Sequence, residues 1–204
     1  MKKCSIITIE RQYASGGSEI GRLAAEKLGI KCYGHEILDI AAERIGMSRE
    51  YLREIEESAT SSMLYSMIMA PNASMRTTDM VPPADKLFIA ETEVINEIAD
   101  RGESCIIIGR AAGHVLEERE DCLRVFIYSD KDARVRRAVN EYGVSEKEAG
   151  SVLKRYDKRR ANFYNMNCAL GWEDREAYDL MLDSSKLGID GCVAVILAAA
   201  GNIG

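Results

Sequence analysis

Short, mostly apolar runs recur along the chain, at residues 5–9, 30–33, 104–108, 123–128 and 178–184. Runs of this length are typical of strands that are buried on both faces of a parallel sheet. Between these runs, apolar residues recur at the spacing of three and four that defines one face of a helix. The alternation predicts an α/β fold with a parallel sheet and right-handed crossovers.

The expected helices have recognisable ends. Glycines suited to a left-handed C-terminal cap follow several of them, and polar residues suited to an N-terminal cap precede others. Ser145 and Glu148 have the spacing of a capping box. The apolar stripes predict helices up to Leu28, over 35–45, 48–57, 85–100 and 130–142, from 145 through 163, and around 193–200.

The amino-acid composition changes over residues 58–84, which are rich in Ser, Thr, Asn and Met and contain all three prolines. One interpretation is a mobile insert that closes over a substrate. The other is a loosely packed pair of helices in which methionine fills irregular gaps. The pattern alone leaves both open.

A chain of 204 residues suits one domain. The sequence shows no long apolar segment typical of a membrane span or a signal peptide. Its six cysteines show no C-x-x-C spacing, and it contains only two histidines. We therefore expect a cytoplasmic protein with reduced cysteines, no membrane partner, no disulfide framework and no dedicated metal site.

The charge is uneven. A net charge of −6 argues against a nucleic-acid partner, yet residues 131–160 hold ten Lys and Arg against five Asp and Glu. An acidic protein with one basic segment indicates a small anionic substrate.

The first apolar run leads into Ser15, Gly16 and Gly17 and then into a helix. Strand, glycine turn and helix in this order form a phosphate cradle, because backbone N–H groups curl around an anion at the positive end of the helix. The alternative is an ordinary turn, since the P-loop pattern G-x-x-x-x-G-K-[ST] is met at one glycine only. Its other positions hold Gln12, Ser18 and Glu19.

Arg110 follows the buried run at 104–108. Ligands of open α/β sheets bind at the carboxyl ends of the strands, so Arg110 is a strong candidate for a binding residue. Two helices add further charged faces, and an ordinary solvated surface is the alternative for both. These faces hold Arg134, Arg137 and Glu141 on one helix, and Lys154, Asp157, Arg160 and Tyr164, with Arg155 and Arg159 beside them, on the next.

Four blocks together resemble the cytidylate kinase-like family, and the resemblance covers nearly the whole chain. The blocks lie at residues 10–21, 33–36, 106–112 and 157–164. The resemblance implies a three-layer α/β/α P-loop kinase fold with a five-stranded parallel sheet. It also implies a single domain over 1–204, with a helical nucleoside monophosphate-binding insert at 47–84 and a lid at about 145–175.

The resemblance also assigns roles, with ATP and Mg²⁺ as cofactors. Arg110 would bind the acceptor monophosphate, Tyr33 and His35 would face the acceptor, and Arg134 and Arg137 would lie in the hinge of the lid. Arg155, Asp157 and Arg160 would organise the transferring phosphoryl group. The residues expected to hold the donor phosphates are Arg11, Ser15, Gly16, Gly17, Ser18 and Glu19.

The chain departs from the family pattern at two places. Ser18 stands where the loop lysine belongs, and Ile108-Gly109-Arg110-Ala111 lacks the acids that help fix cytidine in cytidylate kinases. Three hypotheses follow: an ATP-dependent nucleoside monophosphate kinase, a nucleotide-binding module of the same fold without catalysis, or a P-loop kinase of a non-nucleotide small molecule. The expected binding partner is a small nucleotide substrate. Whether the chain also forms a homodimer is left open by the sequence.

Overall fold

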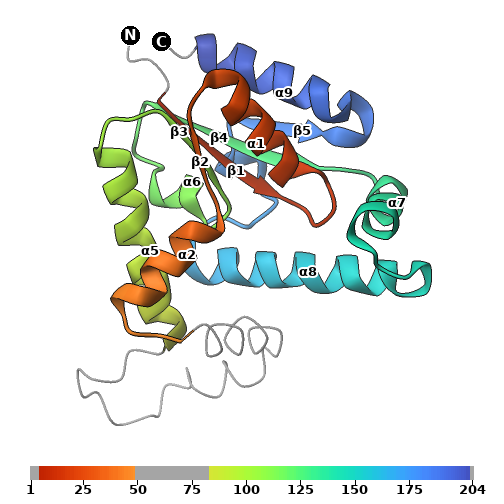
Figure 1. The fold of residues 1–204 in the computed structure, drawn as a ribbon, viewed down its shortest axis with the longest axis horizontal. Helices are drawn as coiled ribbons and strands as arrows, with labels where there is room; N and C mark the ends of the chain where they lie inside the picture. Colours follow the sequence, from red (N-terminus) through yellow and green to blue (C-terminus); the bar gives the residue numbers. More distant parts are fainter. Residues whose placement is uncertain (1–4, 49–82, 203–204) are drawn as a thin grey trace.

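The computed structural model describes residues 5–48 and 83–202. Five parallel strands form one sheet in the order β2-β3-β1-β4-β5, which confirms the predicted architecture (Figure 1). The strands are β1 Ile6–Arg11, β2 Lys31–Tyr33, β3 Cys105–Ile108, β4 Cys122–Tyr128 and β5 Leu180–Asp183.

The central strands are buried on both faces, as their apolar runs require. On β1, Ile7 and Ile9 point into one core, and Ile6 points into the other. On β3, Ile107 shares the core of Ile6. Side chains alternate along a strand, so Glu10 of β1 falls on the same face as Ile6. The pleat thus places a carboxylate on the face where the arginines described below gather.

Helices cover both faces of the sheet (Figure 1). Those on the first face are α1 Gly17–Leu28 and α9 Ser184–Asn202, which pack over Ile7 and Ile9. The opposite face carries α2 His35–Arg44, α5 Pro83–Asp100, the short α6 Ala112–Val115 and the long α8 Glu146–Asn167. The helix α7 Lys131–Tyr142 pairs with α8, and the 3-10 turn η1 Arg175–Ala177 leads into β5.

The helix ends follow the expected chemistry with one exception. Gly29 and Gly143 close α1 and α7 in the left-handed conformation, and the Asp130 carboxylate accepts the Ala133 N–H at 2.7 Å to cap α7. The capping box at Ser145 was wrong, because the Ser145 hydroxyl donates to the Glu148 carboxylate at 2.6 Å and makes no bond to a backbone N–H.

Other boundaries differ from the sequence prediction. The helix α8 runs to Asn167, three residues into the expected loop, and α5 begins at Pro83, two residues early. The short α6 was not predicted, because four residues carry too little periodicity. The helix α9 starts at Ser184 and is kinked at Gly188, whose φ of 69° is left-handed. The predicted helix at 48–57 and most of the segment 58–84 lie outside the described residues.

The helix α9 is also long and apolar enough, over Ser184–Gly201, to match the length and composition of a membrane span. In this fold one side of α9 covers β5 and α1, where Cys192, Val193 and Ile196 are fully buried. Only 17% of the apolar span is buried inside the described structure.

Replacing Ile107 by alanine should lower the free energy of unfolding by about 2–5 kcal/mol, because it removes a fully buried side chain and leaves a cavity. Urea denaturation measures the loss. The matched control is Ile40→Ala on α2, where the side chain is 37% exposed, and its cost should stay under about 1 kcal/mol. Equal losses in the two variants would contradict this assignment of the core.

Candidate functional site

The carboxyl edge of the sheet carries the glycine loop, residues 12–18, between β1 and α1. Two left-handed residues, Ala14 at φ 58° and Gly16 at φ 81°, turn the chain into the helix. The Ser15 hydroxyl donates to the Gln12 carbonyl at 2.8 Å, and the Ser184 hydroxyl donates to the Ser15 carbonyl at 2.6 Å. The loop is therefore fixed from inside and from the start of α9.

The N-terminus of α1 faces this loop without a side-chain cap at Gly16. The first amides of a helix have no intrahelical partner, and together with the helix dipole they favour an anion. The Arg137 guanidinium lies against Gly16, where a Cβ would come within 1.9 Å of its Nη1 atom. Glycine is required here for both the backbone conformation and the approach of Arg137.

The helix α8 docks on the glycine loop through Asp157. Its carboxylate accepts the Tyr13 N–H at 2.7 Å and a hydrogen bond from the Arg134 guanidinium at 2.5 Å. Arg134 also donates to the Tyr13 carbonyl at 3.3 Å. Arg134 and Asp157 thus tie the two helices to the loop, and one loop amide already donates to a carboxylate of the protein.

Aromatic rings reinforce the same contact. The ring of Tyr13 stacks on that of Tyr156, with centroids 4.4 Å apart and planes 10° apart, and Tyr142 meets Tyr13 edge-on. The guanidinium groups of Arg155 and Arg159 lie 5.5 and 5.7 Å from the Tyr156 ring centroid. Those two contacts lie within α8, whereas the Arg160 guanidinium lies 5.8 Å from the Tyr13 ring centroid and, with the Tyr13–Tyr156 stack, holds α8 over the loop.

Four arginines converge on a cavity of about 250 Å³ beneath α8, which we call the arginine pocket. Arg11 comes from β1, Arg110 from the end of β3, and Arg159 and Arg160 from α8. The Nε atom of Arg159 is buried and makes no hydrogen bond with any described residue. The other lining residues are Glu10, His35, Tyr156, Phe163 and Tyr164.

The electrostatics of this pocket favour an anion. Burial, with the neighbouring Arg160 and Arg110 charges, lowers the pKa of Arg11 well below its ordinary value, and Glu10 opposes this shift. Burial also lowers the pKa of Arg160. Crowded cations of this kind are stabilised when a multiply charged anion such as phosphate enters.

Arg110 is held in an uncommon conformation. Gly109, Arg110 and Ala111 all have positive φ, so the chain turns sharply after β3. The Arg110 guanidinium donates at 3.1 Å to Glu91 of α5, a carboxylate that is fully buried. Strain of this kind is retained where surrounding contacts fix it, and it is frequent at functional sites.

Glu10 is a second buried carboxylate beside these arginines. It accepts the Ala111 N–H at 3.2 Å and the Trp172 indole N–H at 3.3 Å, and it is 6% exposed. Glu10, Glu91 and Trp172 were not predicted as site residues. Only the position of Glu10 at the end of a buried strand could have signalled one of them, because the other two depend on tertiary contacts.

Of the other site residues predicted from the sequence, some line the arginine pocket and others lie outside it. His35 lines it, whereas Tyr33 packs against the core beside α2. Arg155 is exposed on α8. Ser18 is exposed at the start of α1, and its hydroxyl accepts the Arg11 Nε–H at 3.4 Å. Glu19 lies in the first turn of α1.

Mg²⁺ in phosphoryl transfer needs one or two carboxylates besides phosphate oxygens and water. Glu19 is the acid placed for this at the N-terminus of α1. Among the described residues no group of three or more His, Cys, Asp or Glu could hold a metal ion. The position of Glu19 fits an ion that a nucleotide would carry with it, because such an ion takes only one or two carboxylates from the protein.

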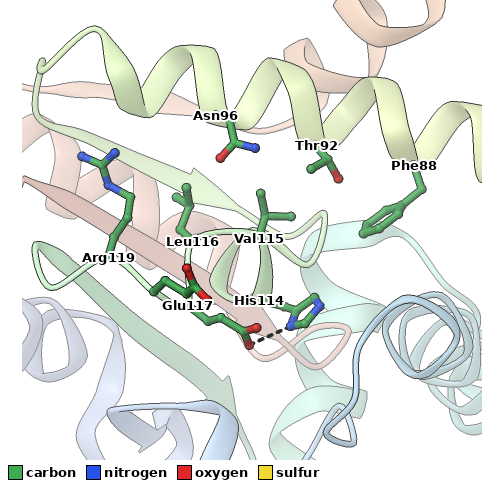
Figure 2. Close-up of a pocket in the computed structure, with 9 residues that line it drawn as sticks. Phe88, Thr92, Asn96, His114, Val115, Leu116, Glu117 and Arg119 are labelled. Carbon is green, nitrogen blue, oxygen red and sulfur yellow. Dashed lines mark hydrogen bonds and ion pairs between the residues drawn. The ribbon is translucent and has the colours of Figure 1, made fainter.

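A second cavity of about 420 Å³ lies between α5 and the segment 114–119 (Figure 2). His114 and Glu117 pair across its mouth at 2.9 Å, and Arg119 is bound to Asp121 at 3.0 Å. Its two basic groups are therefore partnered by acids, whereas the arginine pocket brings four guanidinium groups together. This cavity is a poor site for phosphate.

Comparison with solved structures identifies the class of fold to which the protein belongs. The structure is similar to shikimate kinase from Acinetobacter baumannii, with a TM-score of 0.54 and 17% identity over 96% of this chain and 92% of that chain. It is also similar to an uncharacterized protein from Eubacterium ventriosum, with a TM-score of 0.71 and 24% identity over 97% and 98% of the two chains. The fold is that of the α/β kinases.

The family follows from the sequence comparisons. The model of the cytidylate kinase-like family matches residues 6–186, and the chain belongs to that family. Cytidylate kinase from Thermococcus sibiricus is 26% identical over 97% of this chain and 89% of its own length. Cytidylate kinase from Archaeoglobus fulgidus is 24% identical over 95% and 93% of the two lengths. The resemblance read from the four sequence blocks is confirmed.

Replacing Arg110 by methionine should destabilise the fold, contrary to the small effect expected of a surface arginine. The buried Glu91 carboxylate loses its guanidinium partner, and breaking such a pair costs about 3–5 kcal/mol. Urea denaturation measures the loss, and adding Glu91→Gln should recover a large part of it.

The control is Arg44→Met, which breaks the exposed Arg44–Glu97 ion pair. Exposed pairs contribute little, so this variant should unfold like the wild type. If the Arg110 and Arg44 variants were equally stable, the Arg110–Glu91 pair would not be a structural link.

Proposed function

We propose that the protein is an ATP-dependent nucleoside monophosphate kinase that transfers the γ-phosphoryl group to a small phosphorylated acceptor. The observation that carries the proposal is the arginine pocket beside the glycine loop, both at the carboxyl edge of one parallel sheet. One anion-binding region suits the donor and the other suits the acceptor phosphate. In-line transfer needs these two placed against each other.

The donor would bind at the glycine loop. The free amides at the start of α1 would hold phosphate oxygens, and Arg137, packed on Gly16, would add positive charge. Glu19 would hold the hydrated Mg²⁺ that accompanies the nucleotide. Such an ion would supply positive charge near the migrating phosphoryl group when the nucleotide is bound.

The acceptor would bind in the arginine pocket. Arg110 and Arg160 would hold its phosphate from opposite sides, one from the end of β3 and the other from α8. Arg160 is fixed for this role, because its Nη1 atom donates to the Arg11 carbonyl at 2.9 Å. The helix α8 would keep water from the transferring phosphoryl group, which prevents hydrolysis of ATP.

The proposal does not assign cytidine as the acceptor nucleoside, although the named relatives are cytidylate kinases. Ala111 follows Arg110 where an acid would contact the cytidine, and its N–H donates to Glu10. The second candidate function, nucleotide binding without turnover, is favoured by Ser18 in place of the loop lysine.

We place the protein in the cytoplasm, where ATP and nucleoside monophosphates are present.

A coupled assay of ADP release decides between the two. The purified protein is tested with ATP, Mg²⁺ and a panel of CMP, dCMP, UMP, AMP and GMP, together with shikimate as a non-nucleotide acceptor. Turnover with a monophosphate supports the kinase. Binding of ATP without turnover of any acceptor supports the binding module, and turnover with shikimate alone would overturn the nucleotide assignment.

The variant Arg160→Met should lower kcat/KM for the best acceptor by about a hundredfold, the scale of one lost electrostatic donor. The physical reason is that the acceptor loses one of its guanidinium partners. Initial rates at varied acceptor concentration measure the effect. Arg22→Met, an exposed arginine on α1, is the control and should keep the wild-type rate. An unchanged rate in Arg160→Met would remove this residue from the site.

A further inference from the structure

The side chain of Arg11 follows a path that two glycines leave open. It leaves the end of β1 and passes over Gly17, where an added Cβ would lie 2.5 Å from the Arg11 Cβ and 3.0 Å from its Cγ. Its head then reaches Gly109 at the end of β3, where an added Cβ would lie 2.2 Å from Nη1. A side chain at either glycine would displace the arginine.

This path brings the Arg11 guanidinium close to Ser18, the residue that stands where the P-loop pattern has a charged lysine. Arg11 Nε lies 3.4 Å from the Ser18 hydroxyl, and Ser18 occupies the position of the P-loop lysine. A serine side chain is too short to reach a phosphate above the loop from the helix. The Arg11 guanidinium, which comes from the end of β1, supplies a positive charge to this part of the glycine loop instead.

The local charges indicate that Arg11 is arranged to meet an anion. Burial and the charges of Arg160 and Arg110 lower the pKa of Arg11, and Glu10, which opposes this shift, already has its own donors in Ala111 and Trp172. A structural arginine would be expected to pair with a carboxylate of its own. The hydrogen bond that the structure records for the Arg11 guanidinium is the long one to Ser18.

We infer that Arg11 is the phosphate-binding cation of the glycine loop, and that it replaces, from the end of β1, the lysine that Ser18 removes. Its ligand class is the polyphosphate of a nucleoside triphosphate. The guanidinium offers two parallel N–H donors to the oxygens of adjacent phosphates, whereas a lysine acts as a point charge. The inference rests on the proposed function for the identity of the donor, and it deepens that function at one residue.

Arg11 takes no covalent part in the reaction. During transfer the bond between the γ-phosphorus and the β–γ bridging oxygen breaks, a bond forms to an oxygen of the acceptor phosphate, and ADP leaves with the electron pair. Arg11 stays protonated and stabilises the charge on the β- and γ-phosphate oxygens.

An exchange of the two residues tests this role. The variants are Arg11→Met, Ser18→Lys and the double variant, with Arg22→Met on the exposed face of α1 as the control. Calorimetry measures binding of ATP and of inorganic tripolyphosphate, which lacks base and sugar. Thermal unfolding checks each fold. Arg11→Met should melt at or above the wild-type temperature, because it removes a crowded buried cation.

We expect Arg11→Met to weaken tripolyphosphate and ATP alike, by about a hundredfold. Ser18→Lys in that background should restore most of the affinity, because it returns the cation to the helix. Wild-type affinity in Arg11→Met would overturn the inference. So would a loss that Ser18→Lys does not recover, since that result assigns Arg11 a structural role.

The two proposals fail in different ways. If the wild type binds tripolyphosphate and ATP but phosphorylates no acceptor, the kinase proposal fails while the Arg11 variants still give a binding result. If acceptors are phosphorylated and Arg11→Met binds and turns over as the wild type does, the inference alone fails. A wild type that binds neither ligand overturns both.

A pair of glycine variants tests the path of the side chain. Gly109→Ala and Gly102→Ala both place alanine at a positive φ, of 77° and 70°, so both carry similar backbone strain. Only at Gly109 would the new Cβ displace Arg11, because a Cβ at Gly102 meets no atom within 4 Å. Gly109→Ala should therefore lose at least tenfold more tripolyphosphate affinity than Gly102→Ala, and equal affinities would contradict the proposed path.

Discussion

The site depends on like charges held close together. Four guanidinium groups line a cavity of about 250 Å³, and two buried carboxylates, Glu10 and Glu91, lie against them. Glu91 pairs with Arg110, and Glu10 accepts from the Ala111 N–H and the Trp172 indole, so two carboxylates face four guanidinium groups. The fold therefore keeps an excess of positive charge at the carboxyl edge of the sheet, and the phosphate of the proposed acceptor would balance it.

The same constraint explains the backbone around the pocket. The turn over Gly109, Arg110 and Ala111 is left-handed at each residue, and it directs Arg110 toward α5. Gly16 and Gly17 leave room for Arg137 and Arg11. Together with Gly109, these two glycines are therefore placed where arginine side chains pass close to the backbone.

Much of the fold follows from local pattern, and the site only in part. The apolar runs and glycine caps locate the sheet and most helices, because burial on both faces leaves a strong signal in a strand. Arg110 and the α8 arginines can be identified from their positions on elements. The pairing of Arg110 with Glu91, the indole bond of Trp172 to Glu10, and the reach of Arg11 to Gly109 join residues far apart in the chain. No spacing rule contains such contacts.

The contact of Ser184 with the glycine loop has a consequence for how the chain acquires its function. The Ser184 hydroxyl, 8% exposed, bonds the Ser15 carbonyl and also the Tyr128 carbonyl at 3.2 Å, so it joins the loop to β4 from the start of α9. The loop precedes the other segments of the site along the chain, yet this bond joins it to a residue 169 positions later. During synthesis, therefore, the loop can receive this hydrogen bond only after the start of α9 has left the ribosome.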